Sequence, residues 1–138
     1  MKLLVDTCAW SLLLRRKSSA ALNRDEQATL TSLTEAIRDG RVAIIGPIRQ
    51  EILSGIRGSG QFEKLRNALT AFPDEELSTL NYEEAARLFN ICRSQGIACG
   101  STDILICAVA ARKQWNILTY GQGLKRCMEV LQTEGLSN

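Results

Sequence analysis

Three acidic residues occupy places in the sequence where they could organise the hydrolysis of a phosphate ester. Asp6 directly follows the apolar run at residues 2–5, Glu51 lies on the helix expected after a second apolar run, and Asp103 opens a strongly apolar helix. In a parallel sheet, side chains that follow the strands gather beyond their carboxyl ends, where ligands bind. We therefore expect the three carboxylates to converge at one edge of a sheet.

Converging carboxylates suit a divalent cation. They repel one another, and a bound ion relieves that repulsion. Mg²⁺ prefers oxygen ligands in octahedral geometry and keeps several waters, so a few carboxylates suffice. The ion lowers the pKa of a water and polarises a phosphoryl oxygen. Because the sequence contains no histidine, serine–histidine and cysteine–histidine catalysis and imidazole zinc sites are excluded.

Each acid also has a plainer explanation. Asp6 and Asp103 both stand where a helix is expected to begin, and aspartate is a favoured N-cap residue. Glu51 on its own is compatible with a solvated position on its helix. Spacing and chemistry alone leave both explanations open.

The elements that must position these acids alternate between short apolar runs and amphipathic helices. Strands are expected at residues 2–5, 41–45 and 115–119, with a weak one at 77–80. Helices are expected between them at residues 8–14, 25–38, 47–56, 61–72, 82–93 and 104–111. Asn81 is the expected cap of the fifth helix, and a short helix or strand is expected at the end of the sequence. This alternation predicts an α/β fold with a mainly parallel sheet.

Composition is that of one ordinary globular domain, which we expect to span residues 1–138. The net charge of +2, from 17 Lys and Arg against 15 Asp and Glu, argues neither for nor against a nucleic-acid partner. An acid at position 6 comes too early for a signal-peptide core. No apolar run approaches the ~20 residues of a membrane span, so we expect a cytoplasmic protein without a membrane anchor.

The cysteines show no pattern of a disulfide framework or a zinc site. There are five, an odd number, and no two have the C-x-x-C spacing: Cys8, Cys92, Cys99, Cys107 and Cys127. We interpret them as buried, reduced thiols that behave as small apolar residues, which fits the cytosol.

Four local sequences resemble the motifs of the PIN-domain ribonucleases, in the family's order and along nearly the whole chain. The first is LLVDT at residues 3–7, with Trp10 beyond it; it resembles the family's apolar strand that ends in the first metal-binding acid, here Asp6, with a Ser or Thr behind it. The others are GPIRQEILSG at 46–55, which contains Glu51, TDILICAVA at 102–110, which contains Asp103, and ILT at 117–119.

This resemblance implies a three-layer α/β/α sandwich on a mainly parallel sheet. It also implies a catalytic site in which Asp6, Glu51 and Asp103 hold Mg²⁺ or Mn²⁺ for the cleavage of single-stranded or structured RNA. Compact chains of this length resemble VapC toxins, whose usual partner is a VapB-like antitoxin and which commonly form homodimers.

The sequence departs from the family's pattern after the last motif. The family usually continues Thr-x-Asp-x-Asp-Phe, whereas this chain has TYGQGL at residues 119–124. Gly121 stands where the fourth site acid is expected. We therefore assign the role of the fourth acid to no residue of this sequence. Three carboxylates favour one Mg²⁺ with waters, and Thr119 offers a hydroxyl to a phosphate or to water on the metal.

Several basic residues and one aromatic residue are candidates for RNA contacts. The strongest is the cluster Arg15, Arg16 and Lys17, which leaves the first helix beside the expected site; Arg49, Arg57, Lys125 and Arg126 are weaker. Ordinary solvated charge is the default explanation for each of them. Trp10 could stack a base, although packing in the core is the simpler explanation.

The leading hypothesis is thus a Mg²⁺-dependent endoribonuclease that acts as the toxin of a toxin–antitoxin pair. A second hypothesis keeps the scaffold as a module that binds RNA or an antitoxin without efficient cleavage, since the fourth acid is absent. A third makes Asp6 a phospho-accepting nucleophile, but Cys8 occupies the place of the second Asp that such phosphotransferases usually carry.

Overall fold

A parallel three-stranded sheet forms the centre of the computed structural model, which describes residues 1–15, 21–133 and 135. The strands β1 (Leu3–Val5), β2 (Val42–Ala43) and β3 (Asn116–Leu118) lie in the order β2-β1-β3. In the register, Leu4 of β1 lies opposite Ala43 on one side and Ile117 on the other. The first strand in sequence is therefore the central one, which places Asp6 in the middle of the sheet's carboxyl edge.

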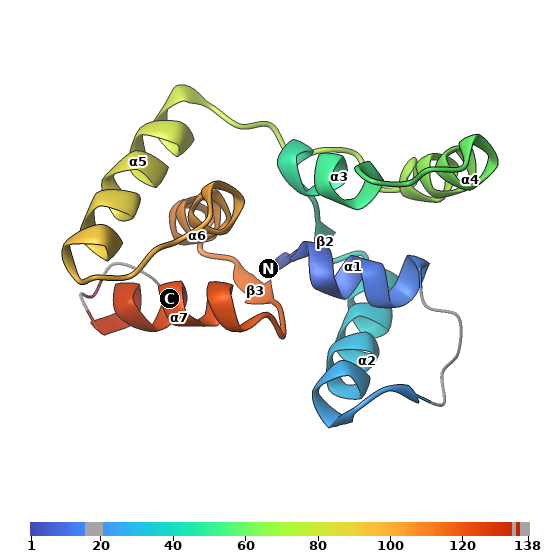
Figure 1. Cartoon of the computed structure of the whole chain (residues 1–138), viewed down its shortest axis with the longest axis horizontal. Helices are drawn as coiled ribbons and strands as arrows, with labels where there is room; N and C mark the ends of the chain where they lie inside the picture. The colour runs from blue at the N-terminus through green and yellow to red at the C-terminus, as the bar shows by residue number, and fades with distance from the viewer. Residues whose placement is uncertain (16–20, 134, 136–138) are drawn as a thin grey trace.

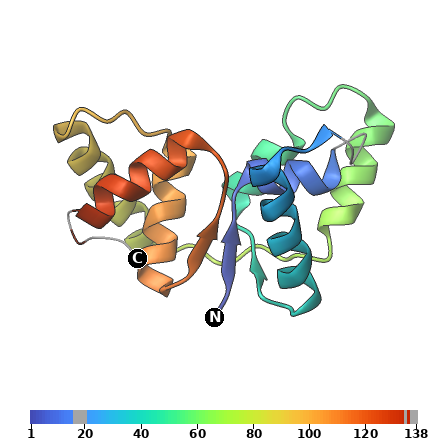
Figure 2. The same ribbon diagram turned by 90° about the horizontal axis from the view of Figure 1, so that it is seen from below.

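Seven helices are present in the described part of the chain. They are α1 (Thr7–Leu14), α2 (Arg24–Arg38), α3 (Gly46–Leu53), α4 (Ser59–Leu69), α5 (Thr79–Ser94), α6 (Ser101–Lys113) and α7 (Gln122–Thr133). Figures 1 and 2 place α5, α6 and α7 on the β3 side of the sheet and α1 to α4 on the side of β1 and β2. The predicted α/β fold with a parallel sheet is confirmed.

Helix α6 and the strands supply much of the hydrophobic core. Every residue from Ile104 to Ala110 is buried, as are Leu4 and Val5 of the central strand. Because this helix is apolar on all sides, it must lie inside the molecule. Because the helix is buried, its orientation is fixed, and its first turn places Asp103 at the edge of the sheet.

Trp10 belongs to this core and does not stack on a base. Its side chain is fully buried, and its ring meets that of Phe72 edge-on, with ring centroids 4.9 Å apart. Edge-to-face contacts of this kind add to the free energy of burial. The packing interpretation of Trp10 is therefore correct.

The weak strand expected at residues 77–80 does not form, because local capping chemistry starts helix α5 there. Ser78 is the N-cap, and Asn81 is the third helical residue of a capping box rather than the cap itself. The Asn81 Oδ1 atom accepts a hydrogen bond of 2.8 Å from the Ser78 backbone N–H. Such bonds satisfy N–H groups that a helix leaves free at its start.

The interpretation of all five cysteines as reduced thiols is wrong for two of them. Cys99 and Cys127, 28 residues apart, form a disulfide that joins the segment before α6 to the middle of α7. Cys92 and Cys107 are buried free thiols, as expected, and Cys8 is half-buried and free. The helices bring the pair together across a separation that no sequence spacing indicates. The argument for the cytosol from reduced thiols does not apply to this pair.

We expect loss of this disulfide to reduce stability. Closing a loop of 28 residues restricts the unfolded chain, which corresponds to about 3–4 kcal/mol in the free energy of unfolding. Urea unfolding of the double variant Cys99→Ala/Cys127→Ala should show this loss. A thiol reductant is the control, because it should lower the midpoint of the wild type and leave that of the variant unchanged. If the reductant leaves the urea midpoint of the wild type unchanged, the prediction is contradicted.

None of the helices formed by residues 1–15, 21–133 and 135 combines the length and the apolar content that a membrane span requires.

Candidate active site

Asp6 is held at the junction of β1 and α1. It is the N-cap of α1, where its Oδ1 atom accepts a hydrogen bond of 2.7 Å from the Thr7 backbone N–H. Only 8% of its surface is exposed. The capping role and the site role are therefore compatible, because capping uses Oδ1 and leaves Oδ2 facing the carboxyl edge of the sheet.

The other oxygen of Asp6 is bound by the segment that follows β3. Thr119 Oγ1 donates to Asp6 Oδ2 at 2.7 Å, and the Gly121 backbone N–H donates to Thr119 Oγ1 at 2.9 Å. The hydroxyl of Thr119 thus orients the Asp6 carboxylate, instead of reaching a phosphate or a water as the sequence suggested. A carboxylate fixed through both oxygens keeps one orientation, as a ligand or a charge-stabilising group requires.

Glu51 is tied to the same edge through Thr7. The Thr7 hydroxyl donates to Glu51 Oε1 at 2.8 Å, which connects α1 with α3. Glu51 is otherwise exposed. This bond orients a side chain that would otherwise move freely in solvent.

Asp103 completes the group of acids at the start of α6. The N-cap of this helix is Gly100, and Asp103 is its third residue, so the capping explanation of Asp103 is wrong. Burial raises the pKa of the Asp103 carboxyl above its usual value, and the charges of Asp6 and Glu51 raise it further. The three acids are therefore close enough to repel one another, as carboxylates gathered at one edge do.

Burial, together with repulsion from Asp6 and Glu51, gives Asp103 a measurable effect on stability. Its folded pKa is raised above the ordinary value of 3.8, so the folded protein binds more protons, and its contribution to stability falls as pH rises from about 3.8 through the raised pKa. In EDTA, Asp103→Asn should unfold at a higher temperature than the wild type at pH 7. This difference in unfolding temperature should vanish at pH values below both the folded and the unfolded pKa of Asp103. A variant that is less stable at pH 7 would count against the repulsion.

Two glycines leave space beside two of the acids. A Cβ atom at Gly121 would lie 3.7 Å from Asp6 Oδ2, and one at Gly123 would lie 3.6 Å from Asp103 Oδ2. Both are ordinary van der Waals distances. The positions at which the sequence lacks the expected acids therefore face the acids that remain.

The donor set fits a hard cation, although it does not form a closed cage. No three Cys, Asp or Glu side chains among the residues described are placed so that they could together hold a metal ion. Mg²⁺ is usually bound through one or two carboxylates and several waters. Asp6 and Asp103, with the open space at the two glycines, match that kind of site.

Sequence reasoning missed Thr7 and Cys8 as parts of this site. The Cys8 Sγ atom lies 3.5 Å from Asp6 Oδ2 and 3.4 Å from Thr119 Oγ1. Burial raises the pKa of the Cys8 thiol, and the charge of Asp6 adds to the effect. Cys8 therefore stays protonated beside Asp6. The position of both residues directly after Asp6 was the available signal.

Five of the seven basic candidates lie in the described part of the chain, and two of them, Arg49 and Arg15, have contacts that bear on their role; Arg57 and Arg126 are exposed and Lys125 is half-buried. The guanidinium of Arg49 donates to Asp74 Oδ1 at 2.8 Å and to the backbone carbonyls of Leu69 and Phe72. It ties α3 to the segment after α4, so its donors are occupied within the protein. Arg15 is exposed and lines a cavity of about 450 Å³ with Tyr120 and Glu26. Arg16 and Lys17 lie outside the described residues.

One family model matches this chain, and one solved structure shares its fold. The model of the PIN domain family matches residues 3–129. The structure is similar to a crystal structure of FitAcB from Neisseria gonorrhoeae, with a TM-score of 0.68, 18% identity and 91% of each chain covered. A search of curated proteins gives no match.

Proposed function

Because the chain belongs to the PIN domain family, we propose that it is a Mg²⁺-dependent endoribonuclease. PIN domains are typically metal-dependent nucleases. The observation that carries the proposal is the gathering of Asp6, Glu51 and Asp103 at one sheet edge, close enough for two of the charges to raise the pKa of the third. Mn²⁺ is the expected substitute for Mg²⁺.

The residues have distinct roles in this proposal. Asp6 and Asp103 hold the cation, which when bound activates water and stabilises charge on the phosphate. Thr119 and Thr7 are positioning residues for Asp6 and Glu51, through bonds of 2.7 and 2.8 Å. Glu51 is the most exposed of the three acids and is oriented by Thr7, and its proposed role is to complete the cation's coordination or to accept a proton.

RNA contacts are proposed on the side of the site formed by α1. The cavity lined by Arg15 also contains Tyr120, the residue before Gly121, and the Arg15 guanidinium is the proposed contact for an RNA strand. An arginine there would contact the phosphate backbone without reading the sequence.

A toxin role is proposed on the family motifs and the compact length of the chain. The expected partner is a VapB-like antitoxin that covers the acidic edge, and the expected assembly is a homodimer. The compact length of the chain is the basis for proposing a VapC-like toxin within the family.

A second candidate function is favoured by Gly121. A Cβ atom added at Gly121 would lie 3.7 Å from Asp6 Oδ2, so an acid at this position would stand beside Asp6. With glycine there, the site has one carboxylate fewer than the family's usual set. The scaffold could then bind RNA or an antitoxin without efficient cleavage.

The deciding experiment removes the metal. Purified, antitoxin-free protein is incubated with a mixed pool of tRNA and structured RNA in Mg²⁺, in Mn²⁺ and in EDTA. We expect cutting in both metals and none in EDTA, and mapping the new ends would identify the target. Intact RNA in both metals, from protein shown to be folded by circular dichroism, would overturn the nuclease proposal and favour the binding function.

A further inference from the structure

The cavity that contains Arg15 and Tyr120 combines apolar walls with a few polar groups. It has a volume of about 450 Å³ and lies between α1, α2 and the segment that follows β3. Figures 1 and 2 show α1 and α2 side by side. The lining includes one aromatic ring, aliphatic side chains and polar groups: Ser11, Leu12, Arg15, Leu22, Glu26 and Tyr120. A cavity of this size and make-up is typical of a site for a small organic group.

Tyr120 connects this cavity with the acidic edge of the sheet. It follows Thr119, whose hydroxyl donates to Asp6, and its backbone hydrogen-bonds the Cys8 thiol. Burial raises the pKa of the Tyr120 phenol, and negative charge at Cys8, Glu26 and Asp6 raises it further. The phenol therefore lies within range of charges from both the acidic edge and the cavity. A group that lies on its ring is a neighbour of the proposed cation site.

The ring of Tyr120 is available for stacking. It is half-buried and makes no contact with another aromatic ring in the described part of the chain. Leu12, which is 6% exposed, and the half-buried Leu22 add apolar surface to the same cavity. Unpaired bases of single-stranded nucleic acid stack on aromatic rings of this kind. A phosphate alone would leave the apolar surface unused, so the walls favour a base.

Glu26 indicates which base the cavity favours. Its Oε1 atom accepts a hydrogen bond of 3.0 Å from the Asn23 backbone N–H in the capping box of α2, and Oε2 has no partner among the described residues. A carboxylate only accepts hydrogen bonds. Guanine alone among the RNA bases presents two adjacent donors, N1–H and N2–H, on its pairing edge. It is therefore the base that a carboxylate recognises best.

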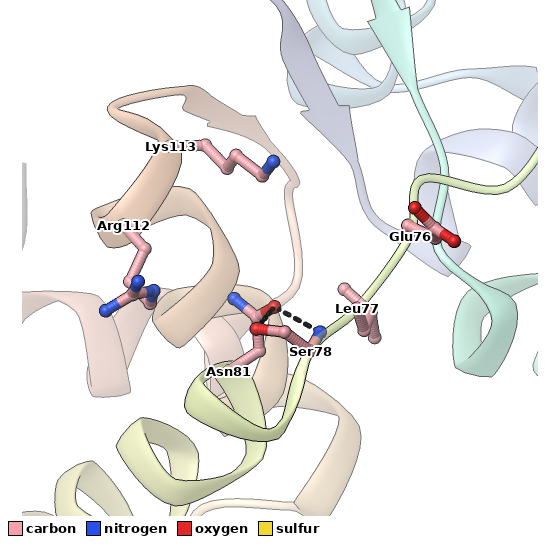
Figure 3. Close-up of a pocket in the computed structure, with 6 residues that line it drawn as sticks. All are labelled: Glu76, Leu77, Ser78, Asn81, Arg112 and Lys113. Carbon is pink, nitrogen blue, oxygen red and sulfur yellow. Dashed lines mark hydrogen bonds between the residues drawn. The ribbon is translucent and has the colours of Figure 1, made fainter.

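The larger cavity at the start of α5 lacks this combination (Figure 3). Its volume is about 530 Å³, and its polar side chains are the capping pair Ser78 and Asn81 and the exposed Glu76, Arg112 and Lys113. No aromatic residue among those described lines it. Helix capping and solvation account for its polar groups, so it indicates no ligand.

We propose that the cavity lined by Tyr120 is the base subsite of the nuclease and takes a guanine of single-stranded RNA. The base stacks on Tyr120, its N1–H and N2–H groups donate to Glu26, and the phosphate beside it contacts Arg15. The proposal rests on the nuclease function proposed above, because it makes these residues select the RNA that the three acids cut.

The test measures binding in EDTA, so its result does not depend on nuclease activity. A labelled six-nucleotide strand of uridine, and the same strand with one central guanine, are titrated with the protein and followed by fluorescence anisotropy. We expect the wild type to bind the guanine strand about tenfold more tightly, the scale of one base read through two hydrogen bonds. Tyr120→Leu should weaken binding of the guanine strand about tenfold through the loss of stacking. Tyr120→Phe keeps the ring and should restore the binding that Tyr120→Leu loses.

Glu26→Gln should abolish the preference for guanine, since glutamine preserves the capping box but offers a donor in place of an acceptor. Two matched controls should bind as the wild type does: Glu35→Gln makes the same change at an exposed position of α2, and Tyr82→Leu removes an exposed tyrosine of α5. Equal binding of the two strands by the wild type, no binding of either, or unchanged binding by folded Tyr120→Leu overturns the proposal.

Failure of the base subsite and failure of the nuclease function give different results. Cutting in Mg²⁺ without a preference for guanine, together with equal binding of the two strands, overturns the base subsite and leaves the nuclease. Guanine-selective binding that Tyr120→Leu loses, by a protein that cuts no RNA in Mg²⁺, supports the guanine pocket and overturns the nuclease.

Discussion

The variant Asp6→Asn should lose RNA cleavage by about 100-fold or more, the scale on which a single charge-stabilising group acts in catalysis. Asparagine keeps the size of the side chain and an oxygen for the Thr7 backbone N–H. Its amide nitrogen would face the Thr119 hydroxyl, which in the wild type donates to Asp6 Oδ2 at 2.7 Å. The neutral asparagine side chain cannot serve as an anionic ligand. The measurement is the rate of cutting of a mapped RNA target in Mg²⁺.

A control separates the loss of charge at the site from loss of charge in general. Asp25 is an exposed acid in the first turn of α2, and Asp25→Asn should cut at the wild-type rate. Thermal unfolding of both variants should show that they are folded. Wild-type activity in a folded Asp6→Asn protein would refute the assignment of Asp6 as the central ligand.

The second large effect is expected when the missing acid is restored. Gly121→Asp should bind Mg²⁺ and Mn²⁺ on the order of tenfold more tightly, since a carboxylate about 4 Å from a cation contributes a few kcal/mol before desolvation is subtracted. The Cβ atom fits without a clash, at 3.4 Å from Thr119 Oγ1 and 3.7 Å from Asp6 Oδ2. Gly121 is also not among the glycines with positive φ. If the second candidate function is correct, this variant should gain cleavage.

Two readings of the unfolding temperature test this expectation without an activity assay. In EDTA, Gly121→Asp should be less stable than the wild type, because it brings another negative charge beside Asp6. In Mg²⁺ the rise in unfolding temperature should be larger for the variant. Gly60→Asp is the control, since a Cβ atom there meets nothing within 4 Å and lies on α4. An equal Mg²⁺ shift in all three proteins contradicts the prediction.

Sequence alone determined the features that depend on local pattern. The apolar run before Asp6 and the apolar helix after Asp103 predicted their places at a strand end and a helix start, and both are correct. The periods of strand and helix are local properties of a chain, so they can be read directly. The family motifs then indicated which of the 15 acidic residues belong together.

Local pattern failed where two interpretations compete over a few residues. The segment at 77–80 has the apolar character of a strand, yet the Ser78–Asn81 capping box starts α5 within it. A side chain that satisfies free backbone N–H groups favours the helix, and this outweighed the weak strand propensity. A serine followed three residues later by asparagine was the available sign.

Only the tertiary structure decided which distant residues touch. The disulfide of Cys99 with Cys127, the hold of Thr119 on Asp6 and the ties of Arg49 to Asp74 and to nearby carbonyls join segments separated by 20 to 113 residues. Such contacts result from how the helices pack on the sheet, because packing, rather than any spacing along the chain, sets the distance between side chains. The sequence thus specified the acids, and the fold specified what holds each of them in place.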